Sequence, residues 1–285
     1  MITFALMKIV RIVMAVVSIA LASAVAGWIY LTLRWASLWD CGPEIPAYQV
    51  VNHDDDSLRV LMIGDSWAGM HDECGGDSLM KRRLEHISGR PTWFQSHGRG
   101  GAKSKDVYRF MSESSTTSEE KASGYCMQPF LQMGLDYCVV MVGINDAASC
   151  LGAEYYCENY RRIISLLLKM YIRPVVVEMP SVDIVGLYSE KPLRYRVSDW
   201  MKAMMTHCRM YDVVPYSESL IFHIAECGWQ DSVVVVRKEQ WNTLGVKDKR
   251  GLYLPDGIHM NRKGYALLDS CLAEAICEDF RNRRH

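Results

Sequence analysis

Two short motifs near opposite ends of the chain carry residues that could perform acyl-transfer chemistry. Ser66 stands in the run Gly-Asp-Ser-Trp at 64–67, directly after an apolar stretch. A serine hydroxyl is a weak nucleophile at neutral pH and needs a base, normally a histidine that a carboxylate orients. The run Asp-Gly-Ile-His at 256–259 supplies both groups within one turn. We therefore expect Ser66 as the nucleophile, His259 as its base and Asp256 as the orienting carboxylate.

A third motif, Gly-Ile-Asn-Asp at 143–146, could stabilise the negative charge that develops when a serine attacks a carbonyl. The Asn145 amide can donate a hydrogen bond to such an oxyanion. The neighbouring Asp146, like Asp65 beside the serine, is expected to brace its loop through hydrogen bonds to the backbone rather than to act as an acid. Each motif alone is common in turns. Their order and their positions relative to the predicted strands make the combination informative.

The apolar runs that precede these motifs predict buried parallel strands. Residues 58–63 lead into the serine motif and residues 137–142 lead into the asparagine motif. Neither run alternates with polar residues, which is typical of strands covered on both faces. Further strands are predicted at 92–95, 174–179 and 211–215, and helices at 78–87, 160–170 and 263–280. Alternating strands and helices predict a central parallel sheet in a three-layer α/β domain, with the polar motifs at its carboxyl edge.

Residues 181–251 form a long segment that a minimal version of this fold does not need. Helical spacing is visible at 195–210 and 217–227, and the segment ends in the charged run Lys-Asp-Lys-Arg at 247–250. We interpret the charged end as a solvated loop, because connecting segments usually run over the surface.

The three motifs resemble blocks of the SGNH/GDSL hydrolase family. The matching residues are Gly64, Asp65 and Ser66 in its first block, Gly143, Asn145 and Asp146 in its third, and Asp256 and His259 in its last. The resemblance extends from about residue 58 to the final helix. It implies a flavodoxin-like three-layer fold, a triad of Ser66, His259 and Asp256, and no metal or organic cofactor.

The same resemblance implies an oxyanion hole made of three donors, which are the backbone N–H of Ser66, the backbone N–H of a second-block glycine, and the Asn145 side chain. The second block lies in the run Ser-His-Gly-Arg-Gly-Gly at 96–101, where the family's Gly-x-x-Gly spacing selects Gly101, with Gly100 as the alternative. The sequence departs from the family at Trp67, where leucine is usual. The Trp67 ring could contact a substrate or pack beneath the helix that follows it.

A long apolar run near the N-terminus predicts a membrane anchor. The run begins at residue 12 and at about 1.5 Å per residue would be roughly 33 Å long, which matches the apolar core of a bilayer. A cleaved signal peptide is the alternative, but the run continues past the Ala-Val-Ala site at 24–26. The expected organisation is a short cytoplasmic N-terminus at 1–11, the transmembrane anchor or signal peptide at 12–34, a linker at 35–56 and the hydrolase domain at 57–285.

The charges around this run predict its orientation. Lys8 and Arg11 precede it, and basic residues favour the cytoplasmic side. The catalytic domain is therefore expected on the non-cytoplasmic side, periplasmic or extracellular, or secreted if the run is cleaved. The 10 cysteines fit an oxidising compartment. Local spacing makes Cys150 with Cys157, and Cys271 with Cys277, candidate disulfides, with buried free thiols as the alternative.

Composition excludes other classes of function. The 32 Lys and Arg residues nearly balance the 33 Asp and Glu residues, so the basic footprint of a nucleic-acid-binding protein is missing. The run His-Asp-Glu-Cys at 71–74 has ligand-type side chains, but adjacent residues on one short segment point in different directions. No metal site is therefore expected there.

These observations together predict a serine ester hydrolase. An envelope location and the family resemblance suggest a small acyl group, such as acetyl, on a carbohydrate as the substrate. One alternative is an O-acyltransferase that uses the same triad to pass the acyl group to a surface glycan. Another is a non-catalytic binding protein on a hydrolase scaffold. An ordinary α/β-hydrolase is disfavoured, because its G-x-S-x-G elbow requires glycine where this chain has Ala68.

Overall fold

The chain consists of two compact units, Met1–Pro43 and Glu44–His285. The computed structural model describes residues 2–39, 41–51, 55–111 and 126–283. The first unit is dominated by one long helix, α1 (Ile2–Trp39). Within it, Met7–Leu33 has a mean hydropathy of 2.4 and is 0% buried, so this helix is long and apolar enough to cross a membrane.

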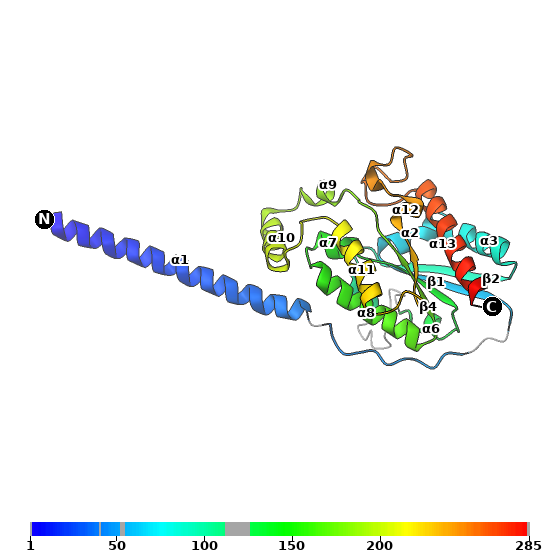
Figure 1. The fold of residues 1–285 in the computed structure, drawn as a ribbon. Helices are drawn as coiled ribbons and strands as arrows, with labels where there is room; N and C mark the ends of the chain where they lie inside the picture. The colour runs from blue at the N-terminus through cyan, green and yellow to red at the C-terminus, as the bar shows by residue number, and fades with distance from the viewer. Residues whose placement is uncertain (1, 40, 52–54, 112–125, 284–285) are drawn as a thin grey trace. The chain divides into compact units, whose positions relative to one another are not determined.

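The second unit is built on a five-stranded sheet in the order β2-β1-β3-β4-β5, in which every neighbouring pair of strands is parallel. Figure 1 shows this sheet with helices packed around it. Its strands are β1 (Leu58–Gly64), β2 (Thr92–Gly98), β3 (Tyr137–Met141), β4 (Arg173–Val177) and β5 (Val234–Val236). This strand order is that of flavodoxin-like proteins. The predicted α/β class with a central parallel sheet is confirmed.

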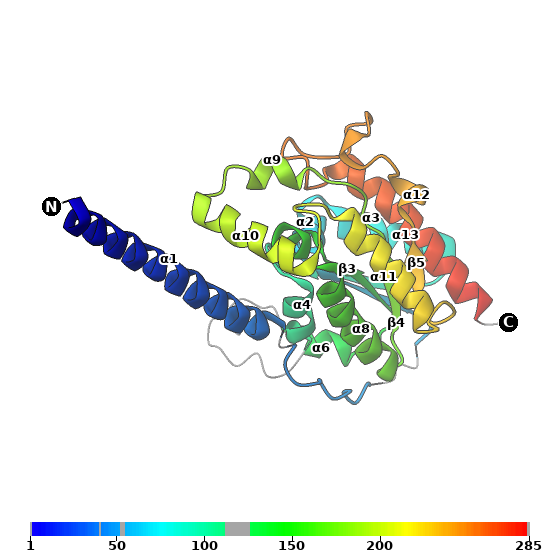
Figure 2. The same ribbon diagram turned by 60° about the vertical axis from the view of Figure 1, so that its left-hand side comes forward.

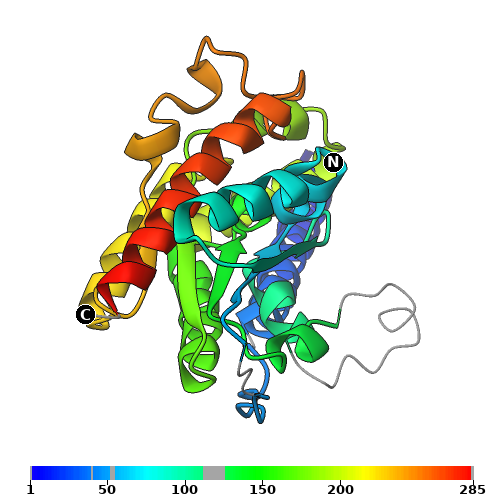
Figure 3. The ribbon, with the colours of Figure 1, turned by 90° about the vertical axis from the view of Figure 1, so that its right-hand side faces the viewer.

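Helices cover both faces of this sheet and explain why its central strands are apolar throughout. The chain moves from β1 to β2 in one direction along the sheet, and then from β2 past β1 to β3, β4 and β5 in the other. Right-handed crossovers place the connecting helices of the two directions on opposite faces. One face carries α3 (Gly76–Ser88) and α13 (Arg262–Asn282), which lie side by side in Figure 3. The other carries α4 (Ser104–Phe110), α8 (Ala153–Lys169) and α11 (Val214–Glu226), seen in Figure 2. Every residue of β3 is consequently buried.

The remaining helices are short or lie around the carboxyl edge of the sheet. They are α2 (Ser66–Glu73), α6 (Gln128–Leu131), α7 (Ile144–Ala148), α9 (Ile184–Tyr188), α10 (Leu193–Thr206), α12 (Lys238–Trp241) and the 3₁₀ turn Gly245–Lys247.

The long segment 181–251 holds one strand, but not at the residues that the sequence predicts. The strand predicted at 211–215 is wrong, because Val214 begins α11 and Pro215 lies in its first turn. Proline suits that position, since its missing N–H would have no helical partner there. The fifth strand is instead Val234–Val236, which pairs with β4 at the edge of the sheet. The two helical patterns predicted in this segment correspond to α10 and α11.

The segment 35–56, which was predicted to be a linker, includes the end of α1 and the first residues of the second unit. Helix α1 continues to Trp39, and the chain from Glu44 onward belongs to the second unit. The Ile45 N–H donates to the Tyr108 hydroxyl at 2.9 Å, and the Tyr48 hydroxyl donates to the Met111 carbonyl at 2.8 Å. Residues 44–51 therefore pack on the domain before β1 begins. Residues 40 and 52–54 of the predicted linker lie outside the described residues.

One of the two candidate disulfides is excluded by geometry. Cys271 and Cys277 both lie on α13. Six residues of α-helix separate their Cα atoms by about 9 Å, and a disulfide requires less than about 7 Å. The other candidate disulfide joins Cys150 to Cys157. In the structure, the thiol of Cys150 interacts with the thiol of Cys208 instead. A hydrogen bond between these two thiols raises the pKa of Cys150 and lowers that of Cys208.

Candidate active site

Ser66 occupies the turn between β1 and α2. It is the first residue of α2, and the carboxylate of the preceding Asp65 caps this helix by accepting the Trp67 N–H at 2.9 Å. The first N–H groups of a helix have no partner within the helix, so the Ser66 N–H points out of its end. The strand-to-helix turn thus presents both the hydroxyl and the N–H of one serine at the carboxyl edge of the sheet.

Asp256 and His259 lie in a tight turn just before α13. One Asp256 oxygen, Oδ1, accepts the backbone N–H groups of Ile258 and His259, each at 2.9 Å. The other oxygen, Oδ2, lies 2.7 Å from His259 Nδ1. Burial raises the pKa of the Asp256 carboxyl, but the bonds from the ring and the two N–H groups outweigh it, so the pKa is lowered overall. The carboxylate is therefore ionised at neutral pH.

The histidine completes a continuous hydrogen-bonded chain to the serine. His259 Nε2 lies 2.9 Å from Ser66 Oγ. An ionised carboxylate can only accept, so Nδ1 carries the ring hydrogen and Nε2 accepts from the serine hydroxyl. The side chains of His259 and Asp256 are 24% and 33% exposed, so solvent can reach this series of hydrogen-bonded side chains.

The ends of the central strands explain why distant motifs meet. Gly64, at the end of β1, pairs with Gly98 at the end of β2 and with Met141 at the end of β3. The three strands therefore end at one level. The strand order also reverses between β1 and β3, and open parallel sheets form their ligand sites at that point.

The other two predicted oxyanion donors lie on the segments that follow β2 and β3. Gly101 sits in a turn with φ +79°, a conformation that favours glycine. The Asn145 Nδ2 donates to the Ala102 carbonyl at 3.0 Å, which ties the glycine turn to α7. An amide NH₂ has two hydrogens, so the second can serve a ligand. The structure thus brings Ser66, Gly101 and Asn145 to the same edge of the sheet.

Asp146, Asp65 and Gly143, which were expected to brace these loops, are buried or confined by their neighbours. Asp146 accepts the N–H and the hydroxyl of Ser104, at 2.9 and 2.6 Å, which links α7 to α4. Burial raises the pKa of Asp146 to about 6 and that of Asp65 to about 7. Gly143 has φ +140°, and a Cβ there would lie 2.5 Å from the Met179 side chain. Only glycine fits this entry into α7.

Two hollows adjoin the segments that carry the predicted triad and the predicted oxyanion donors. One, of about 280 Å³, is formed by residues 251–255 and Gly257 of the histidine turn, together with Asp183, Val246 and Asp248. The other, of about 250 Å³, is formed by residues 99–102 of the glycine turn with Asp106, Arg109 and Phe110. Polar atoms form most of the surface of both hollows, although Val246, Leu252 and Pro255 also line the first.

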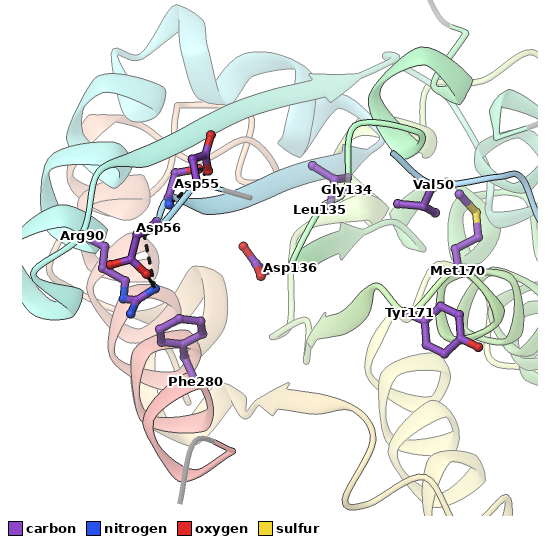
Figure 4. A pocket seen from close by; sticks show the side chains of 11 residues that line it. Val50, Asp55, Asp56, Arg90, Gly134, Leu135, Asp136, Met170, Tyr171 and Phe280 are labelled. Atoms are coloured by element: carbon purple, nitrogen blue, oxygen red, sulfur yellow. Dashed lines mark hydrogen bonds and ion pairs between the residues drawn. The ribbon is translucent and has the colours of Figure 1, made fainter. Parts of the chain in front are cut away.

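A larger hollow, of about 560 Å³, lies at the opposite edge of the sheet (Figure 4). Its lining includes Ser57 and Asp136, which immediately precede β1 and β3, and Tyr171, which lies two residues before β4. The carboxylate of Asp136 accepts the backbone N–H of Arg59 at 2.8 Å, so this carboxylate connects the start of β3 to β1. This hollow is separated from Ser66 by the length of the strands and does not contribute to the triad.

A buried ionic cluster, which was not predicted from the sequence, lies behind the serine helix α2. His71 is 0% exposed, with Nδ1 2.7 Å from Asp77 and Nε2 2.8 Å from Asp269. Asp77 also accepts the hydroxyl of Ser96 on β2 at 2.6 Å. The cluster therefore ties α2 to α3, β2 and α13. One signal was available, because Asp269 interrupts the apolar face of α13 beside Leu268 and Leu272.

Comparisons with known proteins bear on the fold. No protein-family model and no curated protein matches the sequence. The crystal structure of TesA is 15% identical, covers 78% of this chain and 99% of its own, and has a TM-score of 0.50. A lipase/acylhydrolase from Enterococcus faecalis is 16% identical over 78% of this chain and 96% of its own, with a TM-score of 0.49. A GDSL-like lipase from Bacteroides thetaiotaomicron VPI-5482 is 16% identical over 77% and 88%, with a TM-score of 0.47. At such identities, the likeness to TesA is evidence of a shared fold.

Proposed function

We propose that this chain belongs to the SGNH/GDSL hydrolases and acts as a serine ester hydrolase. The observation that carries the proposal is the hydrogen-bonded chain from Asp256 through His259 to Ser66 Oγ, with links of 2.7 and 2.9 Å. Its position at the switch point of the sheet supports a ligand site. The binding-protein alternative requires no such chain.

The reaction has two half-reactions. In the first, His259 Nε2 takes the hydroxyl proton while Ser66 Oγ forms a bond to the ester carbonyl carbon. The tetrahedral intermediate collapses, the alcohol leaves with the proton from His259, and the acyl group stays on Oγ. In the second, His259 takes a proton from water as the water oxygen forms a bond to the acyl carbon. The bond from that carbon to Oγ then breaks, His259 returns the proton to Ser66 Oγ, and the acid is released. Asp256 stabilises the imidazolium that forms in both halves.

Three donors are proposed to hold the oxyanion, which are the backbone N–H groups of Ser66 and Gly101 and the second amide hydrogen of Asn145. Backbone donors are fixed by the α2 end and by the glycine turn, so they need no reorganisation during the reaction. Asn145 is held by its bond to the Ala102 carbonyl. Asp65, Gly143 and Asp146 support these loops without contacting the reacting atoms.

The Asn145→Ala variant is expected to lower kcat for p-nitrophenyl acetate by about 10²–10³-fold with little change in KM, because one oxyanion donor is removed. Steady-state kinetics of the full chain in detergent measure this. Asn159→Ala is the matched control, since the Asn159 amide also donates to a backbone carbonyl, that of Tyr155, but lies on α8. Equal rates in Asn145→Ala and the control would remove Asn145 from the oxyanion hole.

We further propose a small acyl group on a carbohydrate as the substrate. Support comes from the mostly polar surface of the two hollows that adjoin the site, which suits hydroxyl-rich alcohols better than long acyl chains. The charged residues are Asp183 and Asp248 in one hollow and Arg99, Asp106 and Arg109 in the other. Acetylated polysaccharides, p-nitrophenyl esters of increasing chain length and phospholipids should be compared. Turnover that falls from acetate to longer esters, with acetate released from glycans, supports this substrate, whereas preference for phospholipid contradicts it.

The same triad could pass the acyl group to a glycan hydroxyl instead of water. Adding a deacetylated glycan acceptor to the hydrolysis assay separates the two reactions. Acetate release that is unchanged by the acceptor supports a hydrolase. Transfer of acetyl to the acceptor at the expense of acetate supports the O-acyltransferase.

We propose that α1 anchors the chain in a membrane with the catalytic domain on the non-cytoplasmic side. The full chain is then expected to stay in the membrane pellet after an alkaline carbonate wash and to keep its N-terminal residues by intact mass. Ala20→Arg, near the middle of Met7–Leu33, should weaken retention, because arginine at a helix centre costs about 2.5–3.5 kcal/mol. Ala20→Leu is the control. Soluble protein that starts after Ala26 would instead indicate a cleaved signal.

A further inference from the structure

Trp67 connects the serine segment to the histidine segment. Its indole Nε1–H donates to the Ile258 carbonyl at 3.0 Å, and its own carbonyl accepts the Tyr265 hydroxyl at 2.8 Å. Its backbone N–H donates to Asp65. All three polar groups of this residue are therefore satisfied, and two of them are satisfied by the part of the chain that carries His259.

These bonds lie beside the reacting pair. Trp67 follows Ser66 in the chain, and Ile258 precedes His259, so the indole bond and the Ser66–His259 bond join neighbouring residues across the same interface. The hydroxyl–imidazole bond must break and reform in each turnover. The indole–carbonyl bond takes no part in the chemistry and can hold the spacing throughout.

Burial fixes the indole in this position. Trp67 is 1% exposed, so its ring packs inside the domain and does not contact a substrate. The ring of Trp241 meets it edge-on, with centroids 6.1 Å apart and planes at 77°. A buried hydrogen bond from a packed ring has little freedom to lengthen, which makes it a suitable spacer.

We propose that Trp67 is a positioning residue that sets the distance between Ser66 Oγ and His259 Nε2 through its bond to the Ile258 carbonyl. The proposal rests on the proposed esterase function for its kinetic consequence and on geometry for its structural one. An aliphatic side chain at this position has no N–H, so it could fill the space without holding the histidine turn.

The test compares Trp67→Phe with Trp241→Phe in the full chain. Both remove the N–H of a buried tryptophan and keep an aromatic ring, but the buried Trp241 Nε1 has no hydrogen-bond partner among the described residues. Trp67→Phe is expected to lower kcat for p-nitrophenyl acetate roughly 10- to 100-fold, with KM within twofold, because small displacements of reacting groups cost that much. Trp241→Phe is expected to keep kcat within about threefold. Equal kcat in the two variants overturns the proposal.

A structural readout separates this proposal from the proposed function. In crystal structures, the Ser66 Oγ to His259 Nε2 distance is expected to exceed hydrogen-bonding range in Trp67→Phe and to stay near 2.9 Å in Trp241→Phe. An unchanged distance in Trp67→Phe overturns the positioning role even if Ser66 proves catalytic. If Ser66→Ala keeps full turnover, the esterase proposal fails while the distance still decides the role of Trp67. If Trp67→Phe does not fold, Tyr265→Phe can be used instead. It removes the hydrogen bond from the Tyr265 hydroxyl to the Trp67 carbonyl and is also expected to lower kcat.

Discussion

Replacing Ser66 by alanine is expected to lower kcat for p-nitrophenyl acetate by roughly 10⁴- to 10⁶-fold, with the fold intact. The hydroxyl that bonds to His259 Nε2 is the only nucleophile placed at the end of β1, so no neighbouring group among the described residues replaces it. His259→Ala should cause a loss of similar size. The double variant should be no slower than either single variant, because the two residues act as one unit.

The matched control for this loss is Ser149→Ala. Ser149 is a half-buried serine at the end of α7, near the site but outside the triad. It should keep kcat within about twofold, consistent with the small effect of most substitutions away from a site. Similar turnover in the wild type, Ser66→Ala and His259→Ala would mean that hydrolysis occurs elsewhere. The binding-protein alternative would then be favoured.

The second large effect is expected on stability, from His71→Leu. This change leaves Asp269, which is 0% exposed, without the donor that satisfies it. Burial also raises the pKa of Asp269, which reflects how costly its charge is without the histidine. Removing one partner from a buried ion pair typically costs about 3–5 kcal/mol. Denaturant unfolding of the detergent-solubilised chain, followed by fluorescence at pH 7, measures the change in free energy of unfolding.

The pH dependence of this stabilisation has a defined sign. Burial lowers the pKa of His71, but hydrogen bonds to Asp269 and Asp77 outweigh it and raise the pKa from 6.5 to about 9. A base whose pKa is raised in the folded state contributes its full stabilisation to the fold only when the pH is below its pKa in the unfolded state. The difference in unfolding free energy between wild type and His71→Leu should therefore be largest below pH 6.5 and shrink as the pH rises through 9.

His86→Leu is the control for this series, because His86 is an exposed histidine on the adjacent helix α3. Its effect is expected within about 0.5 kcal/mol, as for most surface substitutions. A His71→Leu cost that is equally small, or one that grows above pH 9, would show that His71 is not a charged partner of the two carboxylates.

The geometry of the triad follows from features that the sequence displays. Ser66 and Asn145 each follow an apolar run, and parallel strands bring the ends of such runs to one edge. Asp256 and His259 are close in sequence, so one turn is enough to align them. The flavodoxin-like fold, whose strand order makes β1 and β3 neighbours, was expected from the family resemblance and not from the alternation of strands and helices. The N-terminal helix was equally visible in composition.

Other features depend on tertiary contacts that no local pattern displays. Residues 211–215 were predicted as a strand because Val213 and Val214 are apolar and β-branched. Pro215 suits a first helical turn, and packing decides between the two structures. The edge strand Val234–Val236 is only three residues long, so its signal is weak. The bond from Trp67 to Ile258 joins residues 191 positions apart. Such a contact depends on the full fold.

The most direct test of the central claim is to trap the nucleophile. The full chain should be treated with a fluorophosphonate, which transfers its phosphonyl group to an activated serine, and digested for mass spectrometry. The expected result is a single adduct on Ser66 that forms in the wild type and is lost or strongly slowed in His259→Ala. An adduct on another serine, or labelling of Ser66 at the same rate without His259, would contradict the proposed mechanism.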